Sequence, residues 1–167
     1  YTLLGLVGVL SSLSAATLAV PGDDLQAMLN SGEDLVLKKG AVYEVTSTLR
    51  YTSPGQKIYT QDAENLSDYA TLRIVDEELM MLINGGGMPE VCLERVVCDG
   101  NRYELSVVDK PRIGGGGQPA MVHFGGPGGD GQIVRNCVFM GTRTWSTLKM
   151  HEMASKMITE DNIFLGA

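Results

Sequence analysis

A group of polar and aromatic side chains toward the C-terminal end of this sequence suits the binding of an acidic sugar and the transfer of a proton. Lysine and arginine hold anionic groups, histidine exchanges protons near neutral pH, and an indole ring stacks on a sugar. The candidate catalytic residues are Lys149, Arg143 and His151, and the candidate substrate-binding residues are Trp145, His123 and Glu152. Lys149 or Arg143 is the expected base.

These residues also have a simpler explanation. Trp145 can fill a turn, and a few basic side chains on an exposed strand are ordinary for a solvated sheet face. The sequence has no Cys/His spacing typical of zinc and no acid density typical of a calcium cage, so it predicts no metal site and no evident cofactor.

The candidate site depends on strands that alternate inward and outward residues. If Leu148 and Met150 point inward, then Lys149 and His151 point outward. The same alternation, one repeat earlier in the chain, turns His123 outward beside Lys149.

An internal repeat of short apolar strands predicts the fold. Residues 80–87 align with residues 121–128, and Cys98 aligns with Phe139. The repeat continues further on, where its aligned pairs are Val122 with Leu148, Phe124 with Met150, Asn136 with Asn162, and Phe139 with Leu165. Such repetition is typical of an all-β solenoid in which each coil buries its inner face against its neighbours.

The two ends of the chain have separate interpretations. Residues 1–19 are typical of a signal peptide that lacks its basic n-region, with cleavage after Ala16 or Ala19, although a buried N-terminal helix or strand remains an alternative. A short helix formed by Leu25, Met28 and Leu29 is expected to cap the first coil. Residues 20–167 are then expected to be the N-terminal coils of a secreted, extracellular protein that is truncated at its C-terminus.

The composition excludes some classes of binding partner for this protein. The net charge of -7, with scattered basic residues, argues against nucleic acid. No segment of the mature chain is apolar enough to span a membrane. The three cysteines, Cys92, Cys98 and Cys137, are expected to be buried and free, and a Cys98–Cys137 disulfide is the alternative.

Four segments carry a resemblance to a known family: LVLKKGAVYEV, VCLERVVCDGNR, IVRNCVFMGTRTWSTLKMHE and MITEDNIFLGA. In this order, behind a capping helix, they resemble the pectate lyase and pectin lyase superfamily. The resemblance implies a right-handed, single-stranded parallel β-helix. It also implies a ladder of stacked asparagines, which Asn136 and Asn162 match and Arg95 interrupts.

The same resemblance implies a secreted carbohydrate-active protein whose partner is a polysaccharide. Lyases of the superfamily remove a proton next to a uronate carboxylate with a basic residue, often with Ca²⁺, and hydrolases use paired carboxylates. A polysaccharide lyase or glycoside hydrolase acting on pectin-like glycans is one expectation. A non-catalytic glycan-binding or surface structural module is the other, so the sequence leaves open whether the protein is an enzyme.

Overall fold

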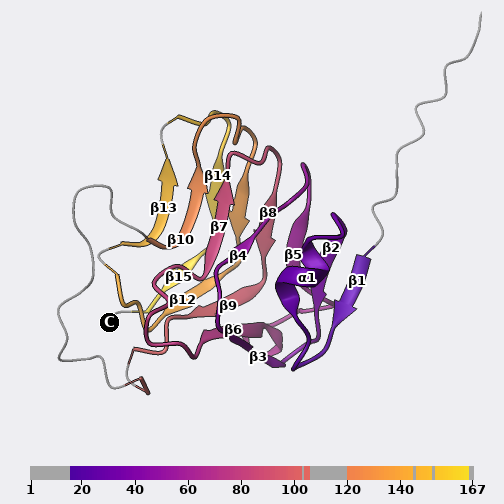
Figure 1. Cartoon of the computed structure of the whole chain (residues 1–167), viewed down its shortest axis with the longest axis vertical. Helices are drawn as coiled ribbons and strands as arrows, with labels where there is room; N and C mark the ends of the chain where they lie inside the picture. Colours follow the sequence, from indigo (N-terminus) through magenta and orange to yellow (C-terminus); the bar gives the residue numbers. More distant parts are fainter. Residues whose placement is uncertain (1–15, 103, 106–119, 145, 152, 166–167) are drawn as a thin grey trace, which may run out of the picture.

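The computed structural model describes residues 16–102, 104–105, 120–144, 146–151 and 153–165. Within these residues the protein is all-β, with parallel strands in three sheets, one short α-helix and one 3-10 turn (Figure 1). The helix is α1 (Leu25–Leu29), and the 3-10 turn is η1 (Leu66–Asp68). No helix among these residues is long and apolar enough to cross a membrane.

The three sheets are named here in chain order. Sheet 1 contains β1 (Ala16–Ala19), β2 (Asp34–Leu37), β5 (Lys57–Thr60), β8 (Cys92–Glu94), β11 (Ile133–Arg135) and β14 (Ile158–Glu160). Sheet 2 contains β3 (Val42–Val45), β6 (Ala70–Ile74), β9 (Val96–Asp99), β12 (Val138–Met140) and β15 (Ile163–Phe164). Sheet 3 contains β4 (Leu49–Arg50), β7 (Ile83–Gly86), β10 (Ala120–Gly125) and β13 (Ser146–His151).

From β2 onward, the chain visits sheets 1, 2 and 3 in the same order on each turn. Each strand pairs in parallel with its counterpart in the next turn, as β10 does with β7 and β13. This arrangement confirms the all-β, parallel part of the sequence prediction, and it is compatible with a parallel β-solenoid.

Apolar side chains from all three sheets form one core. Tyr43, Leu72, Cys98 and Phe139 lie at paired inward positions of sheet 2 and are almost completely buried. Phe139 stacks on Phe164 of the last strand, with ring centroids 5.0 Å apart. Because each turn supplies one residue to each such column, the core is made between turns.

The predicted register is correct between β9 and β12, where Cys98 pairs with Phe139, and between β10 and β13, and it is wrong at two other places. Val122 pairs with Leu148 and Phe124 with Met150, as expected. Phe139, however, pairs with Phe164 instead of Leu165. Between β7 and β10 the alignment of residues 80–87 with residues 121–128 is shifted, because Ile83 pairs with Val122 and the pairing slips by one residue after His123.

The predicted asparagine ladder is also out of register. Arg135 pairs with Glu160 and Val138 with Ile163, which places Asn136 opposite Asp161 and not opposite Asn162. Asn136, Asp161 and the earlier Arg95 all have a left-handed backbone, with φ of 53°, 51° and 54°. The shared feature is therefore the conformation of a turn, which Asn and Asp adopt more easily than other non-glycine residues.

The N-terminal cap forms as predicted. Asp24 accepts a hydrogen bond from the Ala27 backbone N–H at 3.0 Å, and Leu25 and Leu29 are buried. Residues 16–19, interpreted from the sequence as the end of a signal peptide, form β1 against β2. The Ala19 carbonyl accepts a hydrogen bond from the Tyr43 hydroxyl at 2.8 Å, so cleavage after Ala19 would remove a packed strand.

The three cysteines are buried and free. Burial raises the pKa of the Cys92 thiol to about 11 and that of Cys137 to about 12. These side chains are therefore protonated thiols near neutral pH, and they pack as small apolar groups.

A buried glutamine ties the turns after β7 and β10 together. Gln132 is completely buried, and its Oε1 accepts a hydrogen bond from the Gly125 N–H at 2.5 Å. Its Nε2 donates to the carbonyls of Gly86 and Met88, at 3.0 and 2.6 Å. One side chain thus satisfies backbone groups from two successive turns.

Replacing Gln132 with leucine is expected to lower the free energy of unfolding by about 1–3 kcal/mol, because the Gly125 N–H is left buried without a partner. Urea unfolding followed by circular dichroism measures the loss. Gln61→Leu, at an exposed position, is the control. An equal effect of the two substitutions would show that the buried hydrogen bonds of Gln132 do not stabilise the fold.

Candidate functional site

A row of polar side chains crosses the outer face of sheet 3. Arg50 pairs with Asn84, Asn84 with His123, and His123 with Lys149. Their chain neighbours Leu49, Ile83 and Val122 are buried, so the row faces away from the core. With strands about 4.8 Å apart, the row is about 14 Å long.

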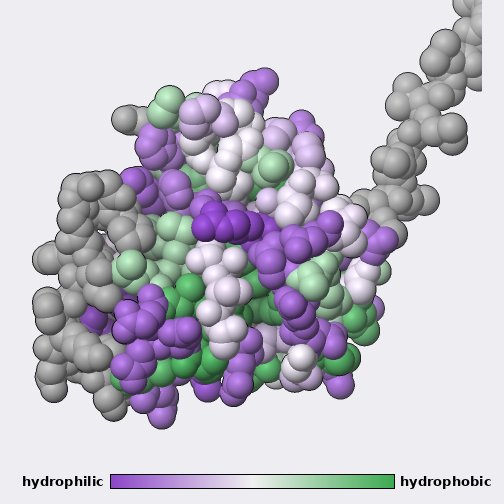
Figure 2. Space-filling model, in the orientation of Figure 1, coloured by the Kyte–Doolittle hydropathy of each residue, from purple (hydrophilic) through white to green (hydrophobic). Residues whose placement is uncertain are grey.

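The row lies on an accessible side of the molecule. In Figure 1, β13, β10 and β7 run side by side, and Figure 2 shows the same side with hydrophilic residues gathered near its centre. Arg50 is exposed, and Asn84, His123 and Lys149 are partly exposed. None of the residues that make up β4, β7, β10 and β13 is acidic.

The surroundings of His123 favour its neutral form. Burial lowers its pKa below the ordinary histidine value, and the neighbouring Lys149 and His151 lower it further. Its Nε2 atom is buried and has no hydrogen-bond partner. A neutral imidazole keeps one ring nitrogen whose lone pair can accept a proton or a hydrogen bond.

His151 completes the cluster at the end of β13. Its ring lies edge-on to the ring of His123, with centroids 6.2 Å apart, and its Nδ1 accepts from the Met153 N–H at 3.3 Å. Glycine at position 125 lets the end of β10 lie close to His151 of β13, because a Cβ there would lie 2.6 Å from the His151 backbone nitrogen.

Arg143 lies elsewhere. Its side chain is buried, and its guanidinium donates to the backbone carbonyls of Asp76 at 2.9 Å and Leu79 at 3.2 Å, as well as to that of Glu77. Burial lowers its pKa. Arg143, a candidate base in the sequence analysis, therefore does not belong to the row, and its contacts are those of a residue that holds the loop between β6 and β7.

The structure brings together three of the six predicted site residues, namely His123, Lys149 and His151. Trp145 and Glu152 lie outside the described residues. Sequence reasoning missed Arg50 and Asn84. An alignment of residues 80–87 two positions earlier along β10 would have placed Asn84 opposite His123 and shown it to be outward.

No metal centre accompanies this row in the described part of the chain, where no three His, Cys, Asp or Glu side chains lie close enough to hold an ion. The outer row supplies two basic side chains, an amide and one imidazole, and His151 beside it adds a second imidazole. Such a set suits an anionic ligand that is elongated along the stack of strands.

Comparison with models of protein families, with curated proteins and with solved structures finds no match to this chain. The function is therefore argued from the fold and from this row.

The pH dependence of stability tests the state of His123. Because the pKa of His123 is lowered in the folded protein, the unfolded chain, with an ordinary histidine pKa of about 6.5, takes up the proton first as the pH falls. Stability is therefore expected to decline below about pH 6.5. His123→Gln should make the decline shallower, as measured by urea unfolding between about pH 5 and 8.

Lys149→Gln is the matched variant. It removes a cation that lowers the pKa of His123, so the pKa, followed by NMR of the imidazole protons, should move up toward its ordinary value. An unchanged pKa would show that Lys149 does not act on His123.

Proposed function

We propose that the protein is a secreted, right-handed parallel β-helix of the pectate lyase-like type, and that the outer face of sheet 3 binds an acidic polysaccharide. The ordered visits to three parallel sheets and the sequence resemblance support the fold. The apolar N-terminal segment supports export.

The observation that carries the proposed binding is the row from Arg50 to Lys149, with one polar side chain on each of four adjacent strands. A linear polyanion lying along the stack meets a cation at each end of this row, and hydrogen-bonding groups from Asn84 and His123 between them. The chain as a whole carries a net charge of -7, so a face without acids on its strands is where an anionic ligand is least repelled.

Isothermal titration calorimetry tests this proposal directly. The protein is titrated with polygalacturonate and alginate, and with neutral galactan as the control. Binding to the acidic glycans is expected, and it should weaken as salt is added because the partly exposed charges are screened. Failure to bind any acidic glycan at low salt would overturn the proposal.

A second candidate function, polysaccharide lyase activity, is favoured by the neutral His123 beside Lys149. Lys149 would hold the uronate carboxylate, which makes the proton on the adjacent carbon more acidic. An imidazole would accept that proton, the C–H electron pair would form a C=C bond, the glycosidic C–O bond would break, and the departing oxygen would take a proton from water. This assignment moves the role of base from Lys149 or Arg143 to a histidine.

Product analysis separates the alternatives. Ultraviolet absorbance from an unsaturated product indicates a lyase. Reducing ends without that absorbance indicate a hydrolase, and binding without either product indicates a glycan-binding module. Repeating the assay with a chelator and with added Ca²⁺ tests the metal that the family resemblance implies. No product from any acidic glycan, with or without Ca²⁺, would exclude the enzymatic candidates.

A further inference from the structure

The N-terminal side of sheet 2 has an unpaired strand edge. β3 is the last strand of sheet 2, whereas sheet 1 continues past β2 to β1. After β1, the chain makes a turn through Val20–Asp24 and then forms α1, which packs beside β4. The first turn of the chain therefore supplies no strand to sheet 2, and a strand position beside β3 is vacant in the part of the chain that the structure describes.

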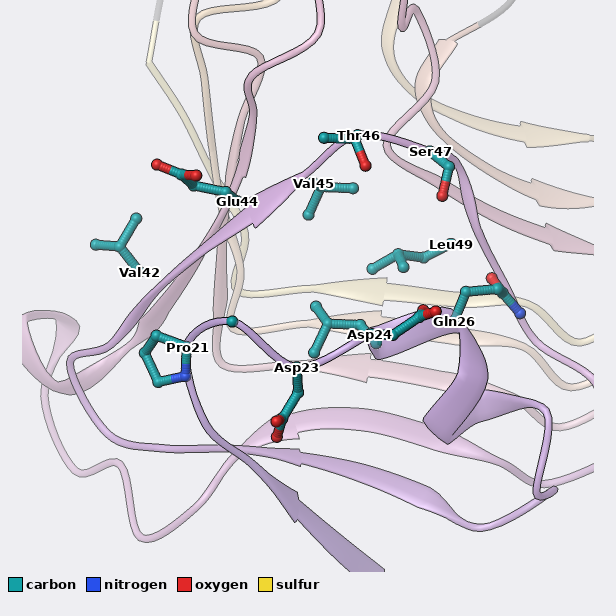
Figure 3. Close-up of a pocket in the computed structure, with 12 residues that line it drawn as sticks. Pro21, Asp23, Asp24, Gln26, Val42, Glu44, Val45, Thr46, Ser47 and Leu49 are labelled. Atoms are coloured by element: carbon teal, nitrogen blue, oxygen red, sulfur yellow. The ribbon is translucent and has the colours of Figure 1, made fainter.

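A pocket of about 640 Å³ occupies this position. It is lined on one side by the turn that contains Pro21, Asp23 and Asp24, and on the other by β3 and the segment that follows it (Figure 3). Leu25, Val45 and Leu49 are buried residues that also line it, so the pocket has an apolar floor and a polar rim.

The edge of β3 offers backbone hydrogen bonds to an occupant. The carbonyls of Ala41 and Val45 accept from Thr71 and Val75 of the next turn, at 2.8 and 3.2 Å. In a parallel strand, successive residues direct their N–H and C=O groups alternately to the two edges, so Ala41, Tyr43 and Val45 face β6. The backbone groups of Val42 and Glu44 thus face the pocket, and none of the described residues pairs with them.

The rim of the pocket is acidic. Asp23, Asp24 and Glu44 line it, and no Lys, Arg or His does. Asp23 and Asp24 each accept one backbone hydrogen bond, from Val20 and Ala27, and Glu44 is exposed. Arg73, the cross-strand neighbour of Glu44, is paired with Asp99 at 2.9 Å.

We propose that this pocket binds an extended basic segment of a partner protein, which lies along β3 and adds a strand to sheet 2. Main-chain hydrogen bonds to Val42 and Glu44 would supply affinity, as in other complexes formed by strand addition. Alternate side chains of the segment would point toward the apolar floor, and the others, lysine or arginine, toward the acidic rim. This surface is separate from the row on sheet 3 and does not depend on the proposed glycan binding.

Fluorescence anisotropy with a labelled peptide of alternating lysine and valine tests the proposal on the full chain. Binding is expected for this peptide, and about tenfold weaker binding or none for a glutamate-valine peptide. A lysine-valine peptide that is N-methylated at alternate residues should bind at least about tenfold more weakly, because it cannot form the strand hydrogen bonds.

Glu44→Lys should weaken binding of the lysine-valine peptide about tenfold or more. Glu160→Lys, an exposed substitution on sheet 1 with the same change in charge, should leave it unchanged. Equal binding of the N-methylated peptide, equal binding of the acidic peptide, or equal effects of the two substitutions would each overturn the proposal. Dimerisation of the protein that Glu44→Lys abolishes would also overturn it, because the edge would then serve a second copy.

Discussion

Phe124→Ala is expected to lower the free energy of unfolding by about 3–5 kcal/mol, as large-to-small changes of a buried phenylalanine do. The Phe124 ring is completely buried, and it lies edge-on to Tyr51 with centroids 5.8 Å apart. Gly85 packs directly on this ring, because a Cβ there would lie 3.0 Å from a ring carbon. Truncation would therefore open a cavity under sheet 3 that its neighbours can fill only in part.

Phe164→Ala is the matched control, because Phe164 is the same residue type but is 55% exposed. Urea unfolding of both variants, followed by circular dichroism, compares the two positions. The Phe164 substitution should cost much less, since most of that side chain already contacts solvent. Similar losses at the two positions would show that sheet 3 does not enclose the core as described.

A double charge reversal, Arg50→Glu with Lys149→Glu, should have the largest effect on the proposed function. The two residues lie at opposite ends of the outer row, so both ends would repel a polyanion instead of holding it. Like charges brought together at an interface cost several kcal/mol, and each 1.4 kcal/mol is a tenfold change in affinity. Affinity for polygalacturonate is expected to fall at least about a hundredfold by calorimetry.

The control for this reversal is Lys38→Glu with Lys57→Glu. Both lysines are exposed and lie away from the outer row, and the two double variants change the net charge equally. The control should retain most of the affinity. If both variants lose binding equally, the interaction depends on total charge and the row has no special role.

The pairing of His123 with Lys149 was predictable because aligning Val122 with Leu148 and Phe124 with Met150 places the residues between them opposite each other. The alternation around Leu148 and Met150 places Lys149 outward, and β10 repeats the pattern around Val122 and Phe124. Period-two patterning is a local property of a strand, so the sequence is sufficient to predict it.

The register between β7 and β10 was not predictable in the same way. A long insertion separates β9 from β10, and the pairing shifts by one residue between His123 and Phe124. The sequence near these strands does not predict this shift, because the shift depends on how Gly85 packs on Phe124 and Gly125 on His151. Asn84 and Arg50 were therefore missed as members of the row.

Arg143 shows a second limit of sequence reasoning. The sequence analysis named it as a candidate base, yet its guanidinium donates to the backbone carbonyls of Asp76 and Leu79. A long side chain can reach either solvent or the interior, and contacts distant in sequence select between them.

The amino-acid pattern alone was enough to predict parallel strands in an all-β fold, an N-terminal capping helix and the outward direction of His123 and Lys149. These features follow from local periodicity and from helix-capping chemistry, which act within a few residues. The folded chain was needed to show the four-residue row, the burial of Arg143 and the unpaired edge of β3, because each depends on contacts between turns that are far apart in the sequence.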